Sequence, residues 1–63
     1  MDDTLEYLLS KIQDERIAKG EALADGAIQS FEEYKHATGV IRGLLIAESI
    51  INDLARRMEN SDE

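Results

Sequence analysis

The stretch ATGVIRGLLIAESIINDLARRM, residues 37–58, decides the fold. Its apolar residues recur at alternating steps of three and four, which is the spacing of one helical face and of a heptad seam. The seam consists of Ala37, Val40, Leu44, Ala47, Ile51, Leu54 and Met58. This pattern predicts a helix from about residue 31 to about residue 59, roughly 40 Å long at 1.5 Å per residue.

Apolar positions on this helix cover a wider arc than one neighbouring helix can bury. The flanking positions are Ile41, Leu45 and Ala55 on one side of the seam, and Gly39, Gly43, Ile46 and Ile50 on the other. A helix that is apolar over so wide an arc is normally buried on several sides. Another helix of the same short chain can cover only one side. We therefore expect self-association or a docked protein partner.

A second periodic stretch precedes this helix. Its apolar stripe consists of Met1, Leu5, Leu8, Leu9, Ile12 and Leu23. The spacings of three, four and longer multiples predict a helix over about residues 3–24. Asp3 is the expected N-cap, with Glu6 three residues later as its capping-box partner.

The segment between the two stretches reads as a turn. Asp25-Gly26 predicts the end of the first helix, because glycine favours the left-handed position that follows a helix. Ser30 and Glu33 form a second capping-box signature at the start of the next helix. A connection this short places two helices antiparallel and adjacent. The expected fold is all-α, one hairpin domain over residues 1–63 with a frayed 60–63 tail, which completes a helical bundle with other chains.

Length and composition also favour association. A chain of 63 residues buries only about 60% of its unfolded surface, so its own core is marginal. Cysteine is absent, which removes disulfides as a source of extra stability. The formal net charge of −7 disfavours nucleic acid as a partner. The longest apolar run, residues 44–47, is far shorter than the roughly 20 residues of a membrane span.

The spacing Gly39-x-x-x-Gly43 places two glycines one turn apart on the same helical face. Without side chains there, another helix backbone can approach closely. Close packing would also compensate the loss of helix propensity at two glycines. We expect the partner interface to contain Gly39, Gly43, Ile46, Ile50, Tyr34 and Arg42. We expect the hairpin core to contain Leu8, Ile12, Leu44, Ala47, Ile51 and Leu54.

One pair of residues resembles a metal-binding element. Glu33-x-x-His36 has the i, i+3 spacing of the Glu-x-x-His element in di-iron carboxylate bundles, and Glu15 or Glu21 would have to supply further ligands. Capping by Glu33 and a surface histidine at position 36 explain the same residues without metal. No serine stands at a telling distance from the single histidine and an acid. We therefore predict neither catalysis nor a cofactor or metal.

Residues 23–57 carry a resemblance to known proteins. Leu-Ala-Asp-Gly at residues 23–26, Tyr34, and Gly39-x-Ile41-Arg42-Gly43-Leu44 resemble small helical proteins encoded among the virion assembly genes of tailed bacteriophages. The similarity continues to Ile51, Leu54 and Arg57 and covers roughly residues 16–57. It implies a phage origin and a place near head, portal or tail assembly, and it implies no catalytic residues.

Three functions follow as hypotheses. The first is a non-catalytic structural or assembly accessory that associates with itself and with a larger phage protein through its helices. The second is a small acidic phage protein that binds a host protein as an inhibitor or adaptor. The third is a two-helix metal-binding subunit. In the first two cases we expect the chain in the host cytoplasm or in the virion, as a homo-oligomer, without nucleic acid or membrane contacts.

Overall fold

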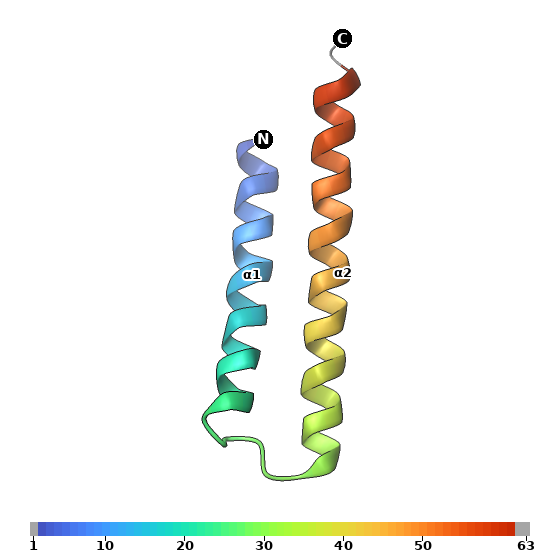
Figure 1. The fold of residues 1–63 in the computed structure, drawn as a ribbon. Helices are drawn as coiled ribbons and strands as arrows, with labels where there is room; N and C mark the ends of the chain where they lie inside the picture. Colours follow the sequence, from blue (N-terminus) through green and yellow to red (C-terminus); the bar gives the residue numbers. More distant parts are fainter. Residues whose placement is uncertain (1, 62–63) are drawn as a thin grey trace.

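The chain folds into a helical hairpin. The computed structural model describes residues 2–61, with the backbone alone at residue 61. Helices α1 (Asp3–Ala24) and α2 (Phe31–Ser61) lie side by side in opposite directions, joined by residues 25–30 (Figure 1). The start of α1 lies beside α2, which extends beyond it at the end opposite the connection. The predicted all-α hairpin is confirmed, and α1 has the predicted bounds.

The N-cap of α1 lies one residue earlier than predicted. Asp2 has an extended backbone, and its carboxylate accepts hydrogen bonds from the amides of Thr4 at 2.8 Å and Leu5 at 3.2 Å. Asp3 is therefore the first helical residue rather than the cap. Asp3 and Glu6 still stabilise the first turn, because negative charge is favourable at the positive end of the helix dipole.

The first helix ends at the predicted glycine. The amide of Asp25 donates the last helical hydrogen bond to the carbonyl of Glu21 at 2.9 Å. Gly26 then adopts a φ of 82°, a left-handed conformation that costs glycine little because it has no Cβ. The Asp25 carboxylate accepts a hydrogen bond from the amide of Ala27 at 3.0 Å and holds the turn.

Helix α2 begins at the predicted cap and ends later than predicted. The Ser30 hydroxyl accepts a hydrogen bond from the amide of Glu33 at 3.1 Å, as an N-cap does. The Glu33 carboxylate accepts from the amide of Gln29 at 3.2 Å, whereas a regular capping box would use the amide of Ser30. The helix continues to Ser61, and residues 62 and 63 lie outside the described chain, so fraying of the 60–63 tail stays a prediction.

The face of α2 that packs on α1 is rotated relative to the predicted seam. Ala37, Glu48 and Ala55 are its buried residues, and Leu44 and Ile51 are half-buried between them. The buried stripe therefore steps through positions 37, 41, 44, 48, 51 and 55. Positions 37, 44 and 51 also belong to the predicted seam. Positions 41, 48 and 55 contact α1 in place of the predicted positions 40, 47 and 54.

This rotation corrects two residues of the predicted hairpin core. Leu8 and Leu54 are 44% and 46% exposed. Because Ala55 is buried against α1, the neighbouring Leu54 is turned about 100° away from the contact. On α1, Leu5 is buried, and Leu8 is turned about 60° from it. The other predicted core residues are half-buried: Ile12, Leu44, Ala47 and Ile51.

The hairpin is elongated and has a thin core. Its extents are 51 × 16 × 13 Å, and its radius of gyration is 14.8 Å, compared with about 11 Å for a compact domain of this length. Among the described residues, no large side chain is fully buried, and the buried apolar residues are Leu5, Ala37 and Ala55. Two helices alone therefore leave many large apolar side chains exposed to water.

Candidate partner interface

The glycines of α2 face away from α1. A Cβ atom built on Gly39 or Gly43 would meet no described atom within 4 Å, apart from the backbone of its own helix turn. The hairpin itself therefore does not require glycine at either position. At 100° per residue, the two glycines lie about 160° and 120° around α2 from the direction of Ala37 and Ala55, which pack on α1.

Large apolar side chains continue this outward face toward the C-terminus of α2. Ile46 and Ile50 are 54% and 64% exposed, and Leu54 lies one turn beyond Ile50. The positions Gly39, Gly43, Ile46, Ile50 and Leu54 fall within about 80° of one another on the helix. We call these five residues the outward stripe. The stripe contains four of the six predicted interface residues and adds Leu54, which was predicted in the hairpin core.

Charged residues lie along one edge of the outward stripe. A shallow hollow of about 250 Å³ is lined by Ile50, Asp53, Leu54 and Arg57. Arg42 and Asp53 lie within about 20° of each other around the helix, both beside the stripe. Arg42 is exposed, and the Asp53 carboxylate is 55% exposed while it pairs with Arg56 three residues later. Both charges are therefore open to a partner that covers the stripe.

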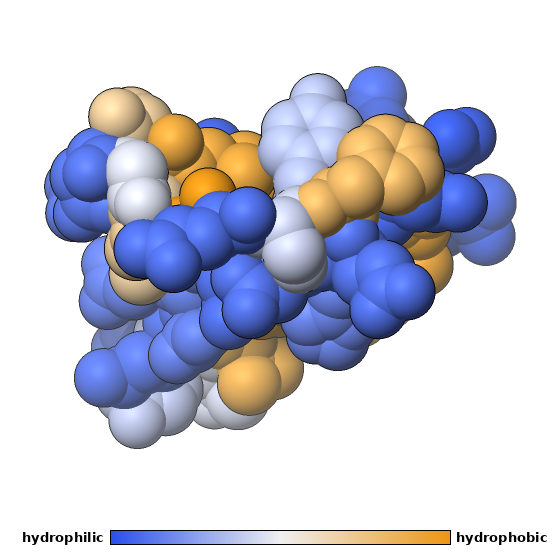
Figure 2. All heavy atoms as spheres, turned by 90° about the horizontal axis from the view of Figure 1, so that it is seen from below, coloured by the Kyte–Doolittle hydropathy of each residue, from blue (hydrophilic) through white to orange (hydrophobic). Residues whose placement is uncertain are grey.

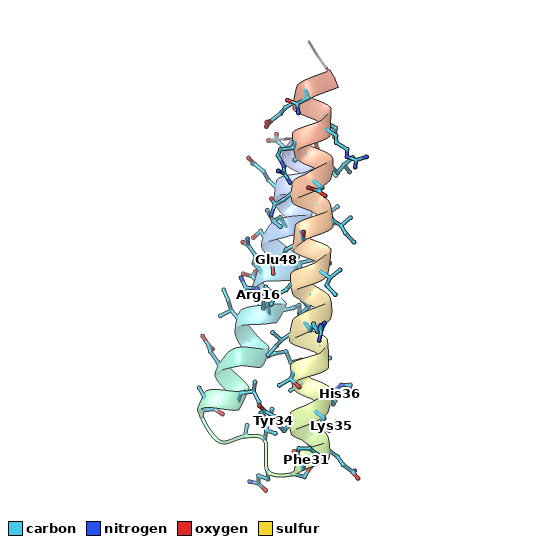
Figure 3. All side chains as sticks on the ribbon, turned by 45° about the vertical axis from the view of Figure 1, so that its right-hand side comes forward. Arg16, Phe31, Tyr34, Lys35, His36 and Glu48 are labelled. Carbon is cyan, nitrogen blue, oxygen red and sulfur yellow. The ribbon has the colours of Figure 1, made fainter. Side chains whose placement is uncertain are left out.

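Tyr34 lies elsewhere on the molecule. It is about 140° around the helix from Gly39, and its ring stacks on Phe31 with 6.5 Å between the centroids. The Lys35 ammonium lies 5.6 Å from the centroid of the Phe31 ring. These residues lie at the connection end of the hairpin, where apolar side chains reach the surface beside hydrophilic ones (Figures 2 and 3). The six predicted interface residues thus belong to two surfaces.

An ion pair joins the two helices within their buried contact. The Nε of Arg16 donates to Oε2 of Glu48 at 2.6 Å, and Nη2 donates to Oε1 at 3.4 Å. The side chain of Glu48 is 11% exposed and that of Arg16 is 32% exposed. Figure 3 shows both side chains between the helices, midway along α1. The sequence did not predict this pairing of Arg16 with Glu48, although Glu48 interrupts an apolar face of α2.

The ion pair marks which parts of the two helices lie opposite each other. Leu8 lies about 12 Å from Arg16 along α1, and Leu54 lies about 9 Å from Glu48 along α2, toward the same end of the hairpin. Leu8 is turned about 60° and Leu54 about 100° from the contact between the helices. Because the helices are antiparallel, both rotations lead to the same side of the hairpin, which is the side that carries the outward stripe. The stripe therefore continues from α2 toward α1 through Leu8.

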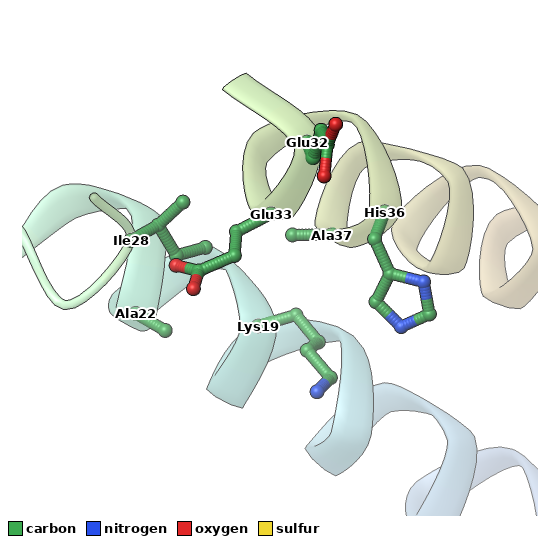
Figure 4. A pocket seen from close by; sticks show the side chains of 7 residues that line it. All are labelled: Lys19, Ala22, Ile28, Glu32, Glu33, His36 and Ala37. Carbon is green, nitrogen blue, oxygen red and sulfur yellow. The ribbon is translucent and has the colours of Figure 1, made fainter. Parts of the chain in front are cut away.

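Glu33 and His36, the candidate metal pair, border an open hollow of about 410 Å³ near the connection. Figure 4 shows their side chains diverging on either side of Ala37, with Lys19 of α1 opposite. The carboxylate of Glu33 also accepts the hydrogen bond from Gln29. Within residues 2–61, no group of three or more His, Asp or Glu side chains is placed to hold a metal ion. This arrangement offers a lone cation few converging ligands.

Comparisons with known proteins show no relative of this chain. No protein-family profile matches it, and neither the curated proteins nor the solved structures include a match. Within the described residues, neither helix carries an apolar stretch long enough to cross a membrane. The fold thus defines the class of protein, a two-helix hairpin with an uncovered apolar face.

Proposed function

We propose that the chain is a non-catalytic structural or assembly accessory that acts by helix–helix association with itself and with a larger protein. The observation that carries this proposal is the outward stripe, an apolar face about 24 Å long that the hairpin leaves open. Exposed apolar surface of this extent marks interaction sites in soluble proteins. Association would bury it and supply the core that two helices lack.

The surface area supports the same proposal. The chain exposes 4928 Å², whereas a compact protein of 7.1 kDa exposes about 4,100 Å². The excess of about 800 Å² is the area that one partner contributes to a stable interface of standard size. The resemblance of residues 16–57 to helical proteins of the phage assembly region favours a virion as the setting, with head, portal or tail protein as the larger partner.

Sedimentation equilibrium of the purified chain, with helicity followed on dilution, tests the proposal. A discrete helical oligomer that dissociates on dilution into helical hairpins of lower melting temperature is the expected result, because association stabilises a hairpin whose own core is thin. A stable, fully helical monomer at all concentrations would contradict self-association and would favour an adaptor that binds a different protein.

A single substitution locates the surface. Gly43→Leu should abolish the oligomer while the hairpin keeps its helicity, because the new side chain meets open space in the single chain and would displace only a partner backbone. Gly20→Leu is the matched control, since Gly20 also faces open space but lies on α1, away from the stripe. Normal assembly of Gly43→Leu, measured by sedimentation, would show that close packing at the glycines is not used.

A further inference from the structure

The outward stripe is complementary to itself when two copies run in opposite directions. Its N-terminal half carries Gly39 and Gly43, which leave open space, and its C-terminal half carries the large side chains of Ile50 and Leu54. Gly43 and Ile50 lie at equal distances from a point between residues 46 and 47. Gly39 and Leu54 are also equidistant from that same point. Ile46 lies next to it.

We propose that α2 pairs with α2 of a second copy in an antiparallel, twofold symmetric dimer centred between residues 46 and 47. In this register Ile50 of each copy packs over Gly43 of the other, and Leu54 packs over Gly39. Large side chains fill the spaces that the glycines leave, which allows close helix packing without voids. The inference rests on the self-association proposed above and specifies its partner, direction and register.

Charge complementarity supports the same direction. With the centre between residues 46 and 47, Arg42 of one copy and Asp53 of the other differ in height by about two residues, or about 3 Å. Both lie on the same edge of the stripe, so an arginine side chain can span this difference. The symmetry produces this pair twice. In a parallel dimer the two copies of this edge would lie on opposite sides of the interface, so Arg42 of one copy and Asp53 of the other would be too far apart to pair.

The dimer also accounts for the area that the hairpin leaves open. A standard interface takes about 800 Å² from each partner, which matches the excess surface of the single chain. The stripe lies on the side of α2 away from α1, so pairing brings two hairpins together as four helices with α2 and its copy in the centre. Leu8 lies at the margin of this interface and can cover it from α1.

Single-cysteine variants test the register, because the chain has no cysteine of its own. In the proposed dimer, two Ile46→Cys side chains lie within about one residue of each other along the axis, which suits a disulfide. Two Leu54→Cys side chains lie about 22 Å apart along the axis and cannot form one. Leu45→Cys is the matched control, a half-exposed leucine outside the stripe.

After mild oxidation, a non-reducing gel should show a covalent dimer for Ile46→Cys and at least about tenfold less for Leu54→Cys and Leu45→Cys. Equal cross-linking of Ile46→Cys and Leu54→Cys would show a parallel dimer and overturn the inference. An oligomer by sedimentation without cross-linking of Ile46→Cys would also overturn it, while self-association itself would stand. A monomeric wild-type chain would overturn both.

Charge reversal provides a second test that does not depend on disulfide geometry. Arg42→Asp alone and Asp53→Arg alone should each weaken the dimer about tenfold, because each places like charges together twice. The double variant Arg42→Asp/Asp53→Arg should recover most of the loss, since it restores the pair with opposite polarity. A double variant that dimerises as weakly as the sum of the single changes would contradict the proposed contact.

Discussion

Replacing Arg16 by methionine is expected to destabilise the hairpin, whereas replacing its partner Glu48 by leucine is not. The two side chains are unequally buried, with 32% of Arg16 and 11% of Glu48 exposed. Without Glu48, the arginine can turn its head into water while its stem still covers apolar surface. Without Arg16, the Glu48 carboxylate remains between the helices and has lost its ion-pair partner.

The magnitude follows from the geometry of the pair. Arg16→Met removes one short charge-assisted hydrogen bond, and the second, at 3.4 Å, is near the limit of the interaction. Such a bond contributes about 1.5–3 kcal/mol, so we expect a loss of about 2 kcal/mol. A chain of 63 residues has a total stability of about 3–9 kcal/mol. The loss corresponds to roughly 8 to 16 °C in melting temperature.

The assay is thermal unfolding followed by circular dichroism, at one fixed chain concentration because the proposed association would contribute to stability. Glu48→Leu should stay within about 1 kcal/mol of wild type, and Arg16→Met/Glu48→Leu should be at least as stable, since apolar residues often replace buried pairs without loss. Equal losses for the two single variants would refute the reasoning, because they would show that burial is not what distinguishes the partners.

Two further substitutions probe the local signals that form the hairpin. Gly26→Ala should lower the stability by about 1 kcal/mol or more, because Gly26 has a φ of 82° and a Cβ is strained there. Gly20→Ala, in the interior of α1 with open space around it, should raise the stability by up to about 1 kcal/mol. If Gly26→Ala raised the melting temperature as Gly20→Ala does, the left-handed turn at Gly26 would not require glycine. Ser30→Ala should cost about 1 kcal/mol, because the amide of Glu33 loses its cap. Ser10→Ala, on an exposed face of α1, is its control, and equal melting temperatures for these two variants would argue against capping by Ser30.

Local chemistry explains why the elements could be predicted. The end of α1 follows from Asp25-Gly26 and the start of α2 from Ser30, because both signals act through hydrogen bonds within four residues. The N-cap of α1 was predicted one residue late, since Asp2 and Asp3 have the same capping ability and only the backbone conformation distinguishes them. No glycine follows α2 to mark its end. The sequence therefore does not distinguish a helix that ends at Glu59 from one that ends at Ser61.

The residues predicted to form the partner interface show which properties local patterns do not predict. Gly39, Gly43, Ile46 and Ile50 could be grouped from their spacing, because residues three and four apart share a helical face. Tyr34 was grouped with them by its residue type, but it lies on another face and stacks on Phe31. Leu54 was assigned to the core, since apolar positions 54 and 55 fit the heptad pattern equally well.

The sequence by itself determined two helices, their direction and the presence of more apolar surface than one hairpin can bury. These properties depend on periodicity, capping and the ratio of apolar to total surface, all of which are local or additive. Only the tertiary structure decided which edge of α2 meets α1. That choice depends on small alanines at positions 37 and 55 and on the pairing of Arg16 with Glu48 across 32 residues of chain. A contact between distant residues has no periodic signal in one sequence, so its geometry appears only when both helices are placed together.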